Sequence, residues 1–141
     1  MSSFITREFD FAIRICSFLA GYYKKSTVSL KRISKALYIS PPFATKIVYR
    51  LRKKGVIGSV QGRNGGLFLN KDPRLLSVLD VLKAMGFKST LNQCIVDHEI
   101  CPLTTGCQIH QFFKQQNKIL FDSFRNKMIA DFAFTFADLP E

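Results

Sequence analysis

The chain has 141 residues, 47% of them hydrophobic, which suits one globular domain with a buried core. No apolar run approaches the ~20 residues of a membrane-spanning helix. Charges interrupt the N-terminus where a signal peptide needs its apolar segment. We therefore expect a cytoplasmic protein with no membrane partner, in which clustered cysteines are more often metal ligands or redox groups than disulfides.

The net charge of +11 is concentrated in one half of the chain. Residues 1–74 contain fifteen Lys and Arg against three Asp and Glu, a net charge of +12, whereas residues 75–141 carry −1. A basic half indicates a polyanionic partner, either nucleic acid or an anionic membrane. The basic residues are interleaved with helix and hairpin signals rather than aligned on one amphipathic face, which favours nucleic acid.

The basic half carries signals for three successive helices. Thr6 is a candidate N-cap for the first, whose apolar residues recur at helical spacing until Gly21. Ser29 is a candidate N-cap for a short second helix. Ser40, followed by Pro41 at the first helical position, predicts the start of a third.

The third helix has two distinct faces. The residues expected to point inward are Phe43, Ile47, Val48 and Leu51. The residues expected to point outward are Thr45, Lys46, Tyr49, Arg50 and Lys53. Gly55 provides the left-handed stop. Two short helices joined by a tight turn, the second with an exposed basic and hydroxyl face, are typical of a helix-turn-helix.

The segment VIGSVQGRNGGLFLN alternates apolar and polar residues around Asn64-Gly65, which predicts a β-hairpin. A hairpin directly after a recognition helix is a wing, and its tip would face a DNA groove or the flanking phosphates. A plain solvated hairpin on a basic helical domain is the alternative. The candidate DNA-binding residues are Ser29, Ser40, Pro42, Thr45, Lys46, Tyr49, Arg50, Gln61, Arg63 and Asn64.

Three of the four cysteines fall in the stretch CIVDHEICPLTTGCQIH, as Cys94, Cys101 and Cys107. Thiolates are the usual ligands of iron-sulfur clusters, and a histidine can replace one of them. His110 lies three residues after Cys107, so both side chains share a face if a helix has begun there. Tetrahedral zinc in a Cys3His site and reduced cysteines with no ligand are the alternatives. Cys16, in the first helix, is expected to pack as a small hydrophobe.

Apolar residues recur at helical spacing after the cysteines: Ile109, Phe112, Phe113, Ile119, Leu120, Phe124, Met128 and Ile129. This is more apolar surface than one helix of a small domain readily hides. Pairing with the same helix of a second subunit would bury this apolar surface. It would also place two helix-turn-helix units on one face of DNA. The alternative is packing entirely within one chain.

The fold predicted is mainly α with a small β-hairpin wing. A winged helix-turn-helix DNA-binding domain is expected at residues 1–82, and a cluster-binding loop with a long dimerisation helix at 83–141. An enzyme is not expected, because no cysteine has a base and an orienting third group, and there is no phosphate-binding glycine loop or carboxylate pair. An iron-sulfur carrier protein is a further alternative, although it would not need the basic half or the wing.

The sequence resembles the bacterial winged-helix repressors typified by the iron-sulfur regulator IscR, the nitric-oxide-sensitive repressor NsrR and the iron regulator RirA. The matching stretches are ITREFDFAIR, ISPPFATKIVYRLRKKGVIGSVQGRNGGLFL, the three spaced cysteines and TFADL, which together run nearly the whole length. The resemblance implies a homodimer that binds a partly palindromic DNA operator, with an iron-sulfur cluster of the 2Fe-2S or 4Fe-4S type tuning its affinity. Relatives such as the repressor CymR lack the cluster cysteines.

The chain departs from the family pattern at two points. Gln61 stands where the family often has Arg or Lys before the wing glycine, which puts a minor-groove contact in doubt, and Arg63 is a possible substitute. The first cysteine interval has six residues rather than five. The resemblance also makes Asp10, donated by the partner subunit in NsrR-like proteins, a competitor of His110 for the fourth ligand position.

Overall fold

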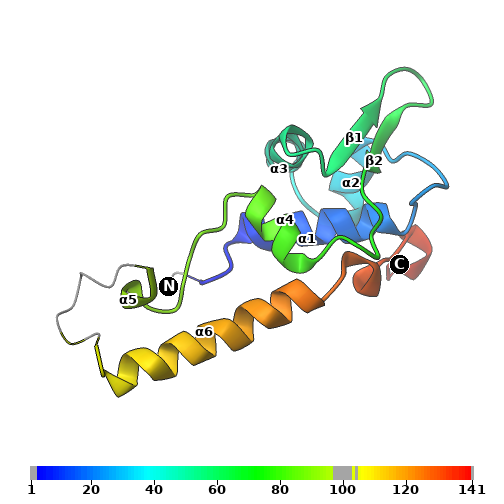
Figure 1. Cartoon of the computed structure of the whole chain (residues 1–141). Helices are drawn as coiled ribbons and strands as arrows, with labels where there is room; N and C mark the ends of the chain where they lie inside the picture. The colour runs from blue at the N-terminus through cyan, green and yellow to red at the C-terminus, as the bar shows by residue number, and fades with distance from the viewer. Residues whose placement is uncertain (1–2, 97–102, 104, 141) are drawn as a thin grey trace.

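The computed structural model describes residues 3–96, 103 and 105–140. A helical body carries a two-stranded hairpin, and a long helix extends from the body as an arm (Figure 1). The elements are α1 (Arg7–Ala20), α2 (Leu30–Leu37), α3 (Pro41–Lys53), β1 (Ile57–Val60), β2 (Gly66–Leu69), α4 (Val78–Ala84), α5 (Gln93–Val96), α6 (Gln108–Asn126), and the 3-10 turns η1 (Ile129–Phe132) and η2 (Phe136–Asp138). The mainly helical fold with one hairpin is thus confirmed. Among the described residues, no helix is long and apolar enough to cross a membrane.

The first three helices begin where their capping residues predict. The hydroxyls of Thr6, Ser29 and Ser40 each accept a hydrogen bond from an amide three residues later, at 3.2–3.4 Å. These bonds satisfy amide groups that have no partner within the helix. Ser77 caps α4 in the same way and forms a capping box with Asp80.

The two strands pair antiparallel from Ile57↔Leu69 to Val60↔Gly66, so the hairpin loop covers residues 61–65. The amide of Gly65 donates a 3.1 Å hydrogen bond to the carbonyl of Gly62. The turn is therefore centred on residues 63 and 64, one residue earlier than expected. Gly62, the first residue of this turn, has a positive φ of +106°, which glycine adopts without strain. The hairpin is confirmed and its turn is corrected.

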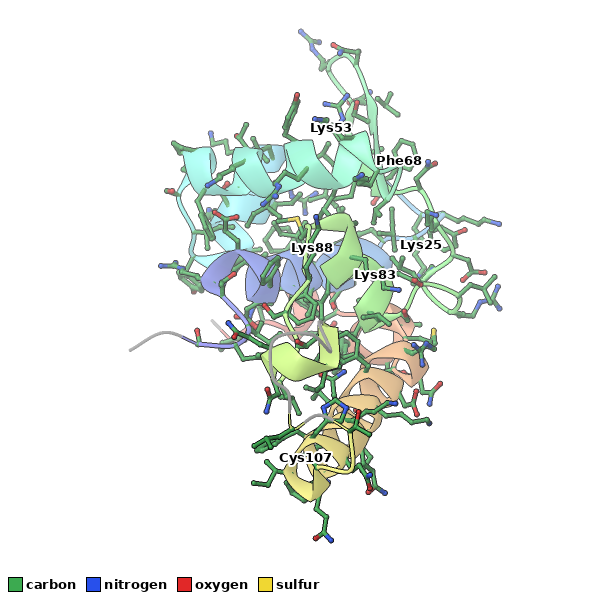
Figure 2. All side chains as sticks on the ribbon, turned by 60° about the vertical axis from the view of Figure 1, so that its left-hand side comes forward. Lys25, Lys53, Phe68, Lys83, Lys88 and Cys107 are labelled. Atoms are coloured by element: carbon green, nitrogen blue, oxygen red, sulfur yellow. The ribbon has the colours of Figure 1, made fainter. Side chains whose placement is uncertain are left out.

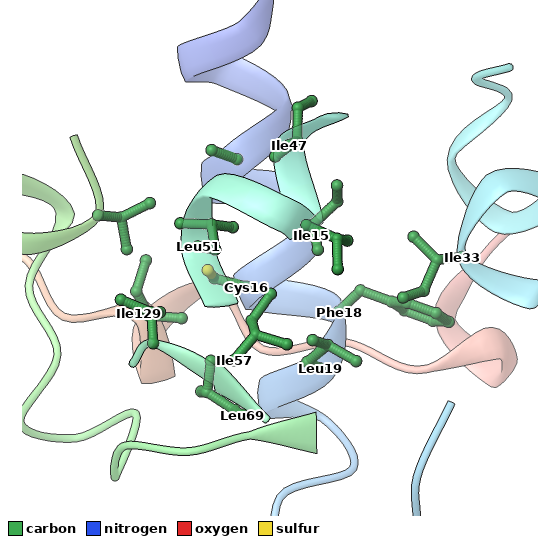
Figure 3. Packing of buried hydrophobic residues seen from close by; sticks show 14 of the residues in the cluster. Ile15, Cys16, Phe18, Leu19, Ile33, Ile47, Leu51, Ile57, Leu69 and Ile129 are labelled. Atoms are coloured by element: carbon green, nitrogen blue, oxygen red, sulfur yellow. The ribbon is translucent and has the colours of Figure 1, made fainter. Parts of the chain in front are cut away.

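The core surrounds α1, whose Ile15, Cys16 and Phe18 are fully buried. Around them lie Ile33 of α2, Ile47 and Leu51 of α3, Ile57 and Leu69 of the hairpin, and Ile129 of the chain end (Figure 3). Cys16 packs as the small hydrophobe that its position in the first helix predicts. One core therefore holds both α3 and the hairpin in fixed positions relative to α1.

The chain returns to this core after the long helix. α6 ends at Asn126, so the predicted helical stripe does not extend to Met128 and Ile129. The reason is a short bridge in which the amide of Ile129 donates to the carbonyl of Leu76 at 2.8 Å, and residue 128 pairs with Ser77. Backbone groups that pair with a neighbouring segment cannot continue the helical ladder.

The segment after α6 also covers one side of α1. The amide of Phe136 donates a 3.0 Å hydrogen bond to the hydroxyl of Tyr22, and the rings of Phe134 and Phe136 lie 5.3 and 5.0 Å from that of Phe18.

The DNA-binding domain is predicted to end at residue 82, which lies inside α4. This helix buries Val81 and Leu82 in the core.

Candidate nucleic-acid interface and cysteine site

An open groove of about 480 Å³ lies between the start of α2, the outer face of α3 and the hairpin. Four residues expected to contact DNA line it: Ser29, Thr45, Tyr49 and Gln61. Ser40 and Pro42 lie at the start of α3, while Arg63 and Asn64 form the hairpin tip. The fold therefore gathers polar residues from three separate segments around one concave surface.

The side chains of α3 that face the groove differ in what they offer a ligand. The hydroxyl of Thr45 donates to the carbonyl of Pro41 at 2.8 Å and can still accept a hydrogen bond, and the residue is exposed. Tyr49 is exposed, and the ammonium group of Lys53 lies 5.4 Å from the centre of its ring. A methyl group, hydroxyls and a cation are groups that read base edges and phosphates.

Arg52 also lines the groove, although the sequence did not identify it as a candidate DNA-binding residue. Its exposed side chain lines the groove on the flank that faces the hairpin. The signal was available, because Arg52 follows Thr45 by seven residues and Tyr49 by three, which places all three on one side of a helix.

Lys46 and Arg50 face away from the groove, toward α1. Both form ion pairs with the carboxylate of Glu8, at 2.7 Å for the lysine and 3.2 Å for the arginine. Arg50 is half-buried rather than outward as expected, because it lies in the junction between two helices. The positive charge of α3 is thus divided between the groove and the contact with α1.

The hairpin is attached to the segment that precedes α2. Val28 and Leu67 exchange two backbone hydrogen bonds of 2.8 Å, and the hydroxyl of Thr27 donates to the carbonyl of Asn64 at 3.3 Å. Gly66 allows this approach, since a Cβ there would lie 2.8 Å from the carbonyl carbon of Val28. Both walls of the groove are therefore fixed to the same body.

The cysteine site is described in part. Cys94 belongs to α5, Cys101 lies outside the described residues, and Cys107 is the N-cap of α6. The amide of His110 donates to the sulfur of Cys107 at 3.4 Å, and the side chain of His110 is buried with 7% exposure. Cys107 is partly exposed. The contact between these two residues involves the backbone amide of His110 and not its imidazole, so the proposal that both side chains bind one metal or cluster stays a prediction.

Among the described residues, no three or more His, Cys, Asp or Glu side chains lie together as a metal site requires, and Cys101 is outside those residues. By their chemistry, clustered cysteines with a histidine suit an iron-sulfur cluster or zinc. Amide hydrogen bonds to sulfur are among the interactions that tune iron-sulfur centres, and a helix N-terminus favours negative charge such as that of a thiolate. Asp10 lies on α1 and forms a 2.9 Å ion pair with Arg14. Cys107 lies at the far end of α6, away from α1 (Figures 1 and 2). Asp10 and Cys107 of one chain are therefore not brought together.

Comparison with known proteins gives sequence relatives and structural neighbours. The chain is 32% identical to the HTH-type transcriptional regulator NsrR of Geobacillus kaustophilus over 106 residues, covering 74% of this chain and 72% of that protein. Its fold is similar to that of CymR, the global cysteine regulator of B. subtilis, with a TM-score of 0.79, 18% identity and coverage of 94% and 97%. It is also similar to T. potens IscR, with a TM-score of 0.68, 22% identity and coverage of 90% and 83%.

The model of one protein family, described as "Rrf2: Iron-dependent Transcriptional regulator", matches residues 5–134. This match covers α1, the helix-turn-helix, the hairpin, the cysteine site and α6. The chain therefore belongs to the Rrf2 family, and it is a DNA-binding transcriptional regulator rather than an enzyme.

Proposed function

We propose that the protein is a homodimeric repressor that reads a partly palindromic DNA operator with the groove between α3 and the hairpin. The observation that carries this proposal is the convergence of Thr45, Tyr49 and Arg52 with Gln61 of the hairpin on one open groove. In this arrangement α3 enters the major groove, while Arg63 and Asn64 at the hairpin tip reach the flanking backbone or minor groove.

The remaining candidate residues have supporting roles. Ser29 and Ser40 cap their helices with hydroxyls that retain further hydrogen-bonding capacity toward a phosphate. Pro42 is exposed at the start of α3, where a helix dipole favours an anion. Lys46 and Arg50, both paired with Glu8, lie on the α1 flank of α3, at the edge of the interface rather than at its centre.

Pairing of two copies through α6 is supported by its exposed apolar residues. Ile109, Phe112 and Ile119 are 67%, 55% and 57% exposed within one chain. Burying them against the same helix of a second copy removes this apolar surface from water and gives two α3 helices for two half-sites. Replacing Phe112 with Glu should convert the dimer to a monomer in sedimentation and weaken operator binding.

We assign Cys94, Cys101 and Cys107 as the ligands of an iron-sulfur cluster. This assignment is supported by the iron-dependent description of the family and by the partly exposed Cys107 at the start of α6. When bound, the cluster supplies a group that nitric oxide, iron limitation or oxidants can modify. The segment after α6 is joined to the core by the hydrogen bond of Ile129 to Leu76, and the same core packs against α3. A change at the cysteine site therefore has a structural route to the proposed DNA-binding groove.

The fourth ligand is either His110 of the same chain or Asp10 of a second copy. His110 is our first choice, because it lies three residues after Cys107 in the same chain and needs no partner subunit. Replacing each residue with Ala and recording the visible spectrum under anaerobic conditions separates the two. If only the Asp10 variant loses or alters the cluster, the histidine assignment is wrong.

The central experiment is anaerobic purification with counts of iron and sulfide per chain, followed by DNA titration of the loaded and cluster-free forms. We expect the loaded form to bind more tightly, with a coupling of ~1–3 kcal/mol. Stoichiometric zinc without iron after anaerobic reconstitution would replace this mechanism with a structural Cys3His zinc site. Failure of both forms to bind DNA in a salt-dependent manner would contradict the proposed nucleic-acid interface.

A further inference from the structure

The first turn of α1 reaches across to the recognition helix through one carboxylate. Glu8 Oε1 lies 2.7 Å from Lys46 Nζ, and Glu8 Oε2 lies 3.2 Å from Arg50 Nη1. Lys46 and Arg50 are four residues apart, so they project from the same side of α3 one turn apart. A single side chain of α1 therefore contacts α3 at two levels.

Glu8 is the least exposed of the three side chains in this contact. The side chains of Glu8, Lys46 and Arg50 are 28%, 62% and 42% exposed. Arg50 also approaches the segment after α4, because a Cβ on Gly86 would lie 3.4 Å from its Nη2. Its guanidinium thus lies among three elements, which restricts the positions it can take.

The position of the contact matters for what α3 presents to DNA. Lys46 and Arg50 lie on the flank toward α1, whereas Thr45, Tyr49 and Arg52 lie toward the hairpin. Two cations on the α1 flank, if released, could reach phosphates of any DNA sequence, because phosphate contacts carry no sequence information. Glu8 instead neutralises one of these two charges and holds both side chains back.

We propose that Glu8 is a positioning residue that raises the DNA-sequence specificity of the protein by restraining Lys46 and Arg50. The carboxylate keeps these cations from binding phosphates indiscriminately, so that affinity depends on the groove-facing residues of α3 and on the hairpin. This inference rests on the proposed use of the α3 groove for DNA recognition.

Magnitudes indicate where the effect of Glu8 is to be measured. Exposed ion pairs contribute only ~0–1 kcal/mol to folding, so the stability of the protein should change little without it. One added phosphate contact, in contrast, raises non-specific affinity about fivefold at ~0.15 M salt, given a salt slope of ~0.9 per contact. DNA titrations are therefore the sensitive measurement.

The test compares Glu8→Gln with wild type on two DNA duplexes. One is a duplex selected by the wild-type protein from a randomised pool, and the other has the same composition in scrambled order. In the variant we expect binding to the scrambled duplex to tighten about fivefold per released cation and the slope of log K against log salt to steepen by ~1–2. The ratio of specific to non-specific affinity should fall correspondingly.

Asp122→Asn is the matched control. Asp122 also joins two cations, Lys118 at 2.7 Å and Arg125 at 2.6 Å, but it lies on α6. The control removes the same negative charge, so an effect of net charge alone would appear equally in both variants. Such equality would overturn the proposal, as would equal weakening of binding to both duplexes by Glu8→Gln.

A second substitution shows whether the restrained cation is responsible. In a Lys46→Gln background, Glu8→Gln should change the salt slope by about one phosphate contact less than it does alone. Full retention of the Glu8 effect in that background and in an Arg50→Gln background would remove both cations from the explanation. Failure of the DNA-groove proposal is recognised separately, because Arg52→Ala would then leave binding to the selected duplex unchanged.

Discussion

The amide of His110 donates a 3.4 Å hydrogen bond to the sulfur of Cys107, so a thiol caps the first turn of α6. Cys107 therefore has a structural role beside its proposed role as a cluster ligand. The two roles make different demands, because a cap needs only an acceptor atom whereas an iron-sulfur cluster prefers a thiolate.

Substitutions of Cys107 should separate these roles. Cys107→Ala should lose up to ~0.5 kcal/mol of stability through the missing cap, because sulfur is a weak acceptor, while Cys107→Ser should be at least as stable as wild type. Both should lose the visible absorbance of anaerobically prepared protein. Urea unfolding of the cluster-free forms measures the cap. Undiminished absorbance in the alanine variant would show that Cys107 is not a ligand.

Arg52 and Thr45 should affect DNA binding in different ways. Arg52→Ala should weaken binding to all sequences and reduce the salt slope by ~1, if its guanidinium meets a phosphate. Thr45→Ala should relax preference at one base step by ~1–3 kcal/mol, if its methyl group or hydroxyl reads that base. Titrations against single-base variants of a selected duplex measure both effects. Arg125→Ala on α6 is the control, and a matching loss in that variant would assign the Arg52 effect to net charge.

Cys16 should be chemically inert in the folded protein. Burial raises the pKa of the Cys16 thiol to about 12, whereas the thiol ordinarily ionises near 9. At pH 8 iodoacetamide should therefore label Cys107 in the folded protein, and should label Cys16 only after unfolding in urea. Mass spectrometry of the labelled peptides decides this. Equal labelling of both cysteines in the folded state would contradict the burial of Cys16.

The same pKa shift makes stability depend on alkaline pH. Between about 9 and about 12 the folded protein keeps the Cys16 proton that the unfolded chain has lost. The free energy of unfolding contributed by this group is therefore full below about pH 9 and decreases as pH rises toward 12. Urea unfolding of wild type and Cys16→Ala at pH 8 and pH 10 should show the larger decrease in wild type.

Gly21→Ala should destabilise the protein although alanine is the better helix former. The backbone of Gly21 has φ −63°, so its conformation is ordinary for any residue. An added Cβ, however, would overlap the carbonyl group of Phe134, whose carbon would lie 2.6 Å away. We expect a loss of ~1–3 kcal/mol in urea unfolding, as is typical of overpacking. A gain in stability would mean that helix propensity outweighs this contact.

The elements of the basic half could be predicted because their signals are local. Capping hydroxyls at Thr6, Ser29 and Ser40, with Gly55 after α3, mark helix ends within a few residues. The alternating pattern before and after the glycine-rich turn predicts the hairpin in the same way. The turn centre was misplaced because several glycines compete for the left-handed position, and only the strand register selects Gly62.

The remaining features depend on contacts between distant residues. Glu8 and Arg50 are 42 residues apart, so the sequence alone does not reveal that Glu8 holds Arg50 on the α1 flank of α3. The end of α6 is likewise set by the pairing of Ile129 with Leu76. The apolar period continues past Asn126, and only this tertiary pairing interrupts the helix. The DNA-contact residues and the cluster ligands remain predictions.

Among the described residues, the second half of α6 packs against the core, and α6 also contacts α5. Phe121 and Phe124 pack against the core, and the ring of Phe121 lies 5.9 Å from that of Phe87, whereas Ile109 and Phe112 are exposed. In a single chain, amide hydrogen exchange should therefore be fast near Phe112, where local fraying exposes the backbone, and slow near Phe124. Association of two copies would slow exchange in the first half and leave the second half nearly unchanged. The protection gradient along one helix thus reports assembly residue by residue, in the absence of both DNA and metal.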